Sequence, residues 1–286
     1  MKDFHPQQLL AGVDLTPASN RALAAAAAWA RHYQARLAAV LVARSDTPWE
    51  FTAGQIAAVR TEGRSERDSL RRRLEHFVQP AGGAAEIAAE VVEGHPETAL
   101  AEAAARWQAE LLVFGLHRRS QTSGLGVEGL PFELMHRTRL PLLAVPEAGP
   151  LAEPAGPRRV LAFLRSGGEP GRALDAATAI AQSWGAPLAI LAPCAASGAA
   201  APDAAHWERQ CLDRVAALSG GGEPRISLRP NLRPEDVAQA ARAPGSLLVL
   251  ESERAGRHHW FHPEPAWETM LRALPIPALL LPGAPG

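Results

Sequence analysis

Short apolar runs alternate along the first half of the chain with segments of helical periodicity. Runs that are apolar throughout are typical of strands buried on both faces of a parallel sheet. They predict strands at residues 9–13, 37–42, 111–114 and 140–145. Residues 86–92, which are rich in alanine, predict a further strand between those at 37–42 and 111–114. The intervening periodic segments predict helices at residues 19–32, 61–77, from about 96 onward, and 130–138. Strict alternation of strand and helix predicts an α/β fold, with a parallel sheet and helices on both faces.

The same order of elements returns after a linker rich in Pro, Gly and Ala at residues 147–157. Ala173-Leu174 follows Ala22-Leu23 by 151 residues, whereas the closing Pro282 follows Pro146 by only 136. The first copy therefore carries about fifteen additional residues, which we place mostly around residues 45–60.

These repeats predict two tandem doubly wound domains, at residues 1–147 and 158–286, each with a five-stranded parallel sheet flanked by helices. We expect the two domains to pack as an intramolecular pseudo-dimer through their last strands, residues 140–145 and 278–281. Pro141 and Pro277 stand at the starts of these strands, where a missing N–H is tolerated.

Composition and charge narrow the classes of function. Hydrophobic residues make up 47% of the 286 residues, enough for a sizeable core, and the net charge of −1 argues against a general binder of nucleic acid or of a membrane surface. No apolar run approaches the roughly 20 residues that span a bilayer. The N-terminal residues lack the apolar core of a signal peptide, and Cys194 and Cys211 form no C-x-x-C pair. We therefore expect a cytoplasmic protein with reduced cysteines.

The segment between the strand at 111–114 and the helix at 130–138 is the best candidate for an anion site. It carries Gly115, Gly124, Gly126 and Gly129, with basic side chains at its start, namely His117, Arg118 and Arg119. Glycines that lead into a helix N-terminus can present backbone N–H groups to a phosphate, and basic side chains assist.

The residues of both ends of the first copy resemble a known family. LLAGVDLTPASNRALAAAAAWARHYQARLAAVLV near its start and LLVFGLHRRS…GL…LPLLAVP near its end resemble the universal stress protein domain, and the whole chain resembles the tandem form. Nucleotide-binding members carry an acidic residue after the first strand and, after the fourth, the motif Gly, two residues, Gly, nine residues, Gly, then Ser or Thr. The resemblance implies a role in stress response through binding, with ATP as the ligand.

Carried over by position, Asp14 matches the acidic residue and Gly115 the first glycine. Gly129 matches the third glycine after a one-residue insertion. Arg118 stands at the second glycine and Leu130 at the hydroxyl residue. These two departures predict weak binding of the adenine nucleotide, because a close-approach glycine and a hydroxyl donor are missing.

The second copy departs further from the motif, with Arg165 in place of Asp14 and Glu251 in place of Gly115. We expect no nucleotide there, because carboxylates repel a triphosphate. Two hypotheses stay open: weak adenine-nucleotide binding in the first half, or an interaction protein that binds an unknown protein partner and no nucleotide. Whether the whole chain dimerises again is also open.

Three other motifs give weaker hypotheses. Gly124–Gly129 reads G-x-G-x-x-G but does not follow a first strand, as a dinucleotide site requires. Ser166-Gly167-Gly168 resembles the loop of ATP-pyrophosphatase enzymes without its Asp and Ser, so we do not expect an enzyme. A histidine cluster (His258, His259 and His262) has no acidic partner at suitable spacing, so we expect no metal site.

Overall fold

The computed structural model describes residues 4–43, 53–82, 86–116, 130–148, 156–164, 171–194, 204–219, 225–230, 234–240, 243–251 and 274–282. Strands and helices alternate as the sequence predicts. The first half has the elements β1 Gln8–Val13, α1 Pro17–Tyr33, β2 Arg36–Ala43, α2 Ala53–Gly82, β3 Ile87–Glu93, α3 Pro96–Arg106, β4 Leu111–Leu116, α4 Leu130–Thr138 and β5 Leu142–Pro146. The second half has β6 Arg159–Phe163, α5 Arg172–Ser183, β7 Leu188–Cys194, α6 Ala204–Ser219, β8 Arg225–Pro230, α7 Pro234–Ala240, β9 Ser246–Glu251 and β10 Ala278–Leu281.

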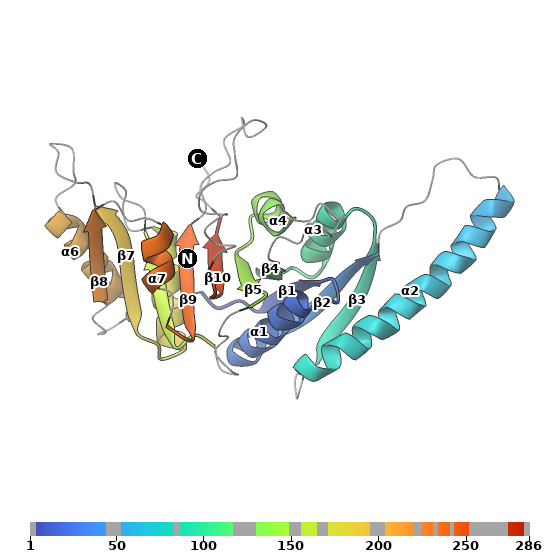
Figure 1. Ribbon diagram of the computed structural model, residues 1–286, viewed down its shortest axis with the longest axis horizontal. Coiled ribbons are helices and arrows are strands. Elements are labelled where there is room, and N and C mark those ends of the chain that lie inside the picture. The colour runs from blue at the N-terminus through green and yellow to red at the C-terminus, as the bar shows by residue number, and fades with distance from the viewer. Residues whose placement is uncertain are drawn as a thin grey trace. The chain divides into compact units, whose positions relative to one another are not determined.

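One compact unit contains β1 to β4 with α1 to α4. Its strands lie in the order β3-β2-β1-β4, and each printed pair is parallel. Figure 1 shows α1 and α2 on one face of this sheet and α3 and α4 on the other. β1 and β4 are apolar and almost entirely buried, because helices cover both faces. This arrangement confirms the predicted doubly wound α/β fold.

Helix α1 begins where the sequence predicts. Thr16 is the N-cap and Pro17 the first helical residue. Leu23 and Ala26 lie on the apolar face and are completely buried. The helix ends at Gln34, which has a left-handed φ of 54° and bonds back to the last turn.

Helix α2 is longer than the charged segment at 61–77 that predicted it. It runs over Ala53–Gly82, and its first turns project beyond the sheet in Figure 1. Alanine-rich sequence before residue 61 has high helix propensity but no amphipathic period, so periodicity alone missed it. Leu74 and Val78 are buried, four residues apart, and form the stripe that packs toward the sheet.

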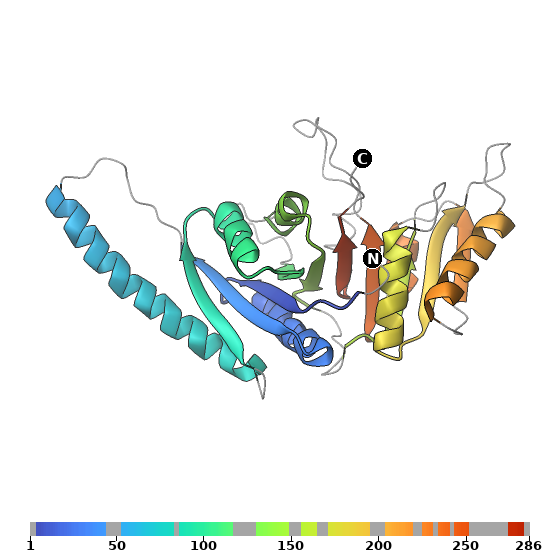
Figure 2. The ribbon, with the colours of Figure 1, turned by 180° about the vertical axis from the view of Figure 1, so that it is seen from behind.

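The other unit contains β5 to β10 with α5 to α7. Its strands lie in the order β5-β10-β9-β6-β7-β8. The pairs from β10 to β8 are parallel, and β5 pairs with β10 in the antiparallel direction. Figure 2 shows α5 and α6 together on one face of the strands, and Figure 1 shows α7 on the opposite face.

The strand registers confirm the internal repeat. Leu9 pairs with Leu37 and Leu111. The residue 151 positions after Leu9 is Val160, which pairs with Leu188 and Leu247. Leu188 follows Leu37 by 151 residues, and Leu247 follows Leu111 by 136 residues. These are the two offsets that the sequence repeat shows. The two copies therefore share one sheet topology.

The last strands of the two copies pair, as the sequence predicts. Leu143 lies opposite Leu279, and the flanking pairs are Leu142 with Leu280 and Ala144 with Ala278. Leu143 and Leu279 are equivalent positions in the repeat, so the antiparallel register is the one that two-fold symmetry produces at a strand pair. All the residues of the two strands named here are buried.

Candidate functional site

The candidate site lies where the strand order reverses direction in the unit that contains β1 to β4. The chain passes from β1 through α1 to β2 on one side, and β4 later pairs on the other side of β1. In open α/β sheets ligands bind outside the carboxyl ends of the strands at such a switch point. Asp14 directly follows β1, and Gly115 is the second-last residue of β4. The structure thus brings two of the predicted site residues to the same edge of neighbouring strands.

Asp14 is exposed and belongs to a tight turn that joins β1 to α1. Its Oδ1 accepts hydrogen bonds from the Thr16 hydroxyl at 2.5 Å and from the Thr16 N–H at 3.1 Å. Leu15 lies between them and has a φ of 61°. This is the left-handed region of the backbone, which residues other than Gly, Asn and Asp rarely adopt. The turn therefore holds the Asp14 carboxylate just outside the carboxyl ends of β1 and β4.

The start of α1 beside this turn is a capping box. The Thr16 hydroxyl accepts from the Ser19 N–H at 3.3 Å, while the Ser19 hydroxyl lies 3.1 Å from the Thr16 N–H. The first turn of the helix carries no acidic side chain. The positive end of the α1 dipole therefore faces the turn without a neutralising carboxylate of its own.

Gly115 packs against the backbone of α1. A Cβ added at this position would lie 2.5 Å from the carbonyl carbon of Ala18 and 2.9 Å from the Ser19 nitrogen. Both neighbours are backbone atoms and cannot move aside without shifting the helix. The fold itself thus requires glycine here, which gives Gly115 a role that does not depend on a ligand.

The other predicted site residues, His117, Arg118 and Gly129, lie outside the described residues. The histidine cluster and Arg165 also lie outside them. Glu251, which replaces Gly115 in the second copy, is the last residue of β9 and is partly exposed. Its position at the carboxyl end of β9 matches that of Gly115 in β4, so the two copies differ in side chain at equivalent places.

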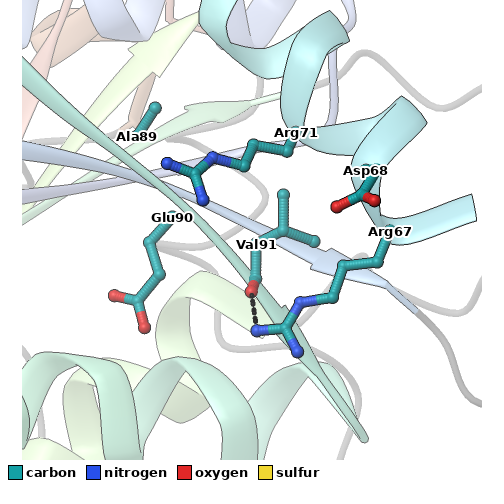
Figure 3. Close-up of a pocket in the computed structure, with 6 residues that line it drawn as sticks. All are labelled: Arg67, Asp68, Arg71, Ala89, Glu90 and Val91. Atoms are coloured by element: carbon teal, nitrogen blue, oxygen red, sulfur yellow. Dashed lines mark hydrogen bonds between the residues drawn. The ribbon is translucent and has the colours of Figure 1, made fainter. Parts of the chain in front are cut away.

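A separate hollow of about 440 Å³ lies between α2 and β3. Figure 3 shows Arg67, Asp68 and Arg71 of α2 on one side of it, with Ala89 and Val91 of β3 on the other. The Arg67 guanidinium donates to the Val91 carbonyl at 3.3 Å. The sequence did not predict this hollow. The small side chain of Ala89 leaves space between β3 and α2, but an alanine in a strand pattern does not indicate such a space in advance.

Three of the charged residues around the hollow, Arg67, Arg71 and Glu90, have partners within the fold. Arg67 lies 3.6 Å from Glu93, and Arg71 lies 2.9 Å from Glu75. Glu90 is turned to the other face of β3, where it accepts from Arg106 and from the Trp107 ring N–H at 2.6 Å each. β3 is the outer strand of this order. The hydrogen bond from Arg67 to the Val91 carbonyl therefore occupies a backbone group of an edge strand, and a charged side chain there disfavours pairing with another strand.

Two carboxylates meet where α3 and α4 begin. Burial raises the pKa of Glu133, and a hydrogen bond to Glu97 together with the charge of Glu97 raises it further, while Arg137 opposes the shift. Both glutamates stand in the first turn of their helices. We therefore expect the packing of α3 on α4 to respond to the protonation of Glu133.

Within the described part of the chain, no group of three or more His, Cys, Asp and Glu side chains could hold a metal ion. No described helix is both long enough and apolar enough to cross a membrane.

The fold and the switch-point residues define the class of protein: a tandem, doubly wound α/β protein. The model of the universal stress protein family matches residues 6–146. A universal stress protein from Archaeoglobus fulgidus is similar in structure over 96% of this chain and 98% of its own, with 16% identity and a TM-score of 0.68. A putative universal stress protein from Pseudomonas aeruginosa has 16% identity over 97% of this chain and 93% of its own, with a TM-score of 0.58. No curated protein matches the sequence.

The chain belongs to the universal stress protein family through its first copy, and its second copy has the same fold. The family match falls on the first copy, and the structural match extends over both. The resemblance found in the sequence is therefore confirmed.

Proposed function

We propose that this chain acts in the stress response by binding, in the cytoplasm, and that its first half binds an adenine nucleotide weakly. The observation that carries the proposal is the position of Asp14 at the switch point between β1 and β4. A carboxylate there can accept hydrogen bonds from a ribose hydroxyl or from an amino group. The N-terminus of α1 next to it provides a positive partial charge that favours an anionic ligand.

The phosphates are assigned to the segment between β4 and α4. In this proposal, Gly115 and Gly129 mark its ends, and His117 and Arg118 supply positive charge near its start. Arg118 can also donate to a phosphate with its guanidinium group. No resident metal is required by this assignment.

Binding is proposed to be weak and confined to the first half. Arg118 and Leu130 replace a close-approach glycine and a hydroxyl donor, and the loss of one neutral hydrogen bond changes affinity by about tenfold or less. The second copy has Arg165, which accepts no hydrogen bond, and Glu251, which adds a negative charge.

Calorimetric titration of ATP into the intact chain tests this proposal. We expect at most one site per chain, which is lost in Asp14→Ala and retained in Arg165→Ala. Two equivalent sites, or a single site that is insensitive to Asp14→Ala, would contradict the assignment. Gly115→Ala is unsuitable as a binding variant, because its clash with Ala18 affects the fold directly.

A second candidate is an interaction protein that binds a protein partner and no nucleotide. It is favoured by the fact that Asp14 and Gly115 each have a role without a ligand, in the turn before α1 and in packing on α1. Absence of ATP binding in the same titration, with the chain folded, selects this candidate.

A further inference from the structure

We propose that Thr16 is a positioning residue of the nucleotide site, because its hydroxyl sets the orientation in which Asp14 receives the ligand. This inference rests on the proposed function. Asp14 Oδ1 accepts from both the hydroxyl and the N–H of Thr16, at 2.5 and 3.1 Å. Hydrogen bonds to an ionised acceptor are stronger than those between neutral groups, so two of them on one oxygen fix the plane of the carboxylate.

The Thr16 hydroxyl is itself held by the helix. It accepts from the Ser19 N–H at 3.3 Å while it donates to Asp14, which uses a hydroxyl as donor and acceptor at once. Hydrogen bonds in such a chain polarise and strengthen one another. The carboxylate is thereby tied to the first turn of α1, whose inner face is buried, instead of rotating freely in solvent.

The second copy provides an internal comparison. At 151 residues beyond Asp14, Thr16 and Ser19, the sequence has Arg165, Gly167 and Pro170, so the acid and both hydroxyls are replaced together. The corresponding helix α5 follows Gly171, and no side-chain hydrogen bond caps it.

Helix α5 nevertheless forms and buries its apolar face, in which Leu174 and Ile180 are completely buried. The body of the helix at this place in the fold, from Arg172 onward, therefore does not depend on a hydroxyl cap. The hydroxyl of Thr16 occurs in the copy that has the carboxylate and is missing from the copy that lacks it, which points to a role that acts through Asp14.

The test compares the ATP affinities of three variants with that of the intact wild-type chain. Thr16→Val removes the hydroxyl at nearly constant shape and is expected to weaken binding about five- to tenfold, the factor that corresponds to one hydrogen bond. Thr16→Ser keeps the hydroxyl and should bind within about twofold of the wild type.

Ser19→Ala is the matched control for helix capping. It breaks the other half of the capping box but leaves both bonds to Asp14 in place. Both Thr16→Val and Ser19→Ala are expected to lower the melting temperature, whereas only Thr16→Val should change the affinity for ATP. Equal affinity losses in the two variants, or an unchanged affinity in Thr16→Val, would overturn the positioning role.

A measurement without ligand separates this inference from the proposed function. In NMR spectra of the free protein, the Thr16 hydroxyl proton should exchange slowly with water, and Asp14→Ala should accelerate the exchange. If the wild-type chain binds no ATP, the proposed function is wrong, and so is a role for Thr16 in that binding. If ATP binds but the hydroxyl proton exchanges at the same rate in Asp14→Ala, the proposed function stands and the positioning role fails.

Discussion

At the residue scale, Gly115 lies directly against backbone atoms of α1, which cannot move aside as a side chain can. An added Cβ would lie 2.5 Å from the Ala18 carbonyl carbon and 2.6 Å from its oxygen. We expect Gly115→Ala to lower the free energy of unfolding by about 2–3 kcal/mol, because overpacking against backbone forces α1 or β4 to shift. Urea denaturation followed by circular dichroism measures the change.

Gly82 serves as the control for the Gly115 variant. A Cβ there would meet only the Ile87 side chain, at 3.8 Å, which is an ordinary contact distance. Gly82→Ala should therefore leave stability nearly unchanged. If Gly115→Ala is as stable as Gly82→Ala, the glycine is not required by packing, and its presence would then argue for close approach of a ligand.

Residue types predicted part of the candidate site and missed the rest. Gly115 could be noted from its place between a buried strand and a helix, whereas Asp14 was assigned to the site through the resemblance to the universal stress protein domain. The left-handed Leu15 could not be found, since leucine has no preference for positive φ. The bond from Thr16 to Asp14 was missed because the sequence showed a helix cap and gave no sign that the same hydroxyl also serves the carboxylate.

At the scale of elements, an ion pair between the partly exposed Arg214 and the buried Asp175 joins α6 to α5. Arg214 donates to both carboxylate oxygens of Asp175, at 2.5 and 2.8 Å, and the Asp175 side chain is only 5% exposed. Arg214→Ala leaves a buried carboxylate without this partner, so we expect a loss of about 2–3 kcal/mol in unfolding free energy. Chemical denaturation of the variant measures the loss.

The exposed pair of Arg71 and Glu75 on α2 provides the comparison, since both side chains are about half exposed or more. Arg71→Ala should change stability by no more than about 0.5 kcal/mol. An equal effect of the two arginine substitutions would show that the Asp175–Arg214 pair contributes no more than a surface pair.

The contact between α3 and α4 should respond to pH. A carboxyl group whose pKa is raised by folding stabilises the fold in acid, and this contribution is lost as the pH rises through the raised value. The pKa of Glu133 is raised from 4.5 by burial and by Glu97. We therefore expect Glu133→Gln to raise the melting temperature at pH 7 and to leave it nearly unchanged at pH 4.

Thermal unfolding across this pH range measures the effect, with Glu102→Gln as the charge control, because Glu102 is an exposed glutamate on α3. A gain at pH 7 that Glu102→Gln reproduces would reflect net charge alone. The same gain at both pH values would show that Glu133 is not protonated preferentially in the folded chain.

Most elements could be predicted because their sequences follow the periods of the structure. β1 and β4 are apolar runs, and α1 combines an apolar stripe with a Thr-Pro start. The first turns of α2 were missed because residues 53–60 are too few, with only Ile56 and Val59 as large apolar residues, to show a helical period by themselves. The register of β5 on β10 was not predicted, since a run of leucines fits several registers equally well.

At the scale of the whole molecule, the two copies share strand registers while their helices differ. α2 spans 30 residues and α6, its counterpart, spans 16. The additional length that the sequence placed around residues 45–60 therefore goes partly into the start of α2. The sheet is alike in the two copies, because most of its strands must match a neighbour on each side. The peripheral helix differs, because it packs through a narrow stripe only.

The pairing of β5 with β10 can be tested by cross-linking in the full chain. Directly opposite residues of an antiparallel pair have Cα atoms about 4.5–5.5 Å apart, within the range that a disulfide spans. Leu143 and Leu279 are opposite each other. We expect the double variant Leu143→Cys, Leu279→Cys to form an intramolecular disulfide on mild oxidation, seen as a faster-migrating monomer in non-reducing electrophoresis.

The combination of Leu143→Cys with Leu281→Cys is the matched control. It displaces one cysteine by two residues along the strand, which places the Cα atoms about 7–8 Å apart and disfavours the bond. Equal cross-linking of both variants would contradict the register. A cross-linked dimer in place of a monomer would show that the last strands pair between two copies of the chain, because the same self-complementary register serves a second molecule as well as it serves the second half of one.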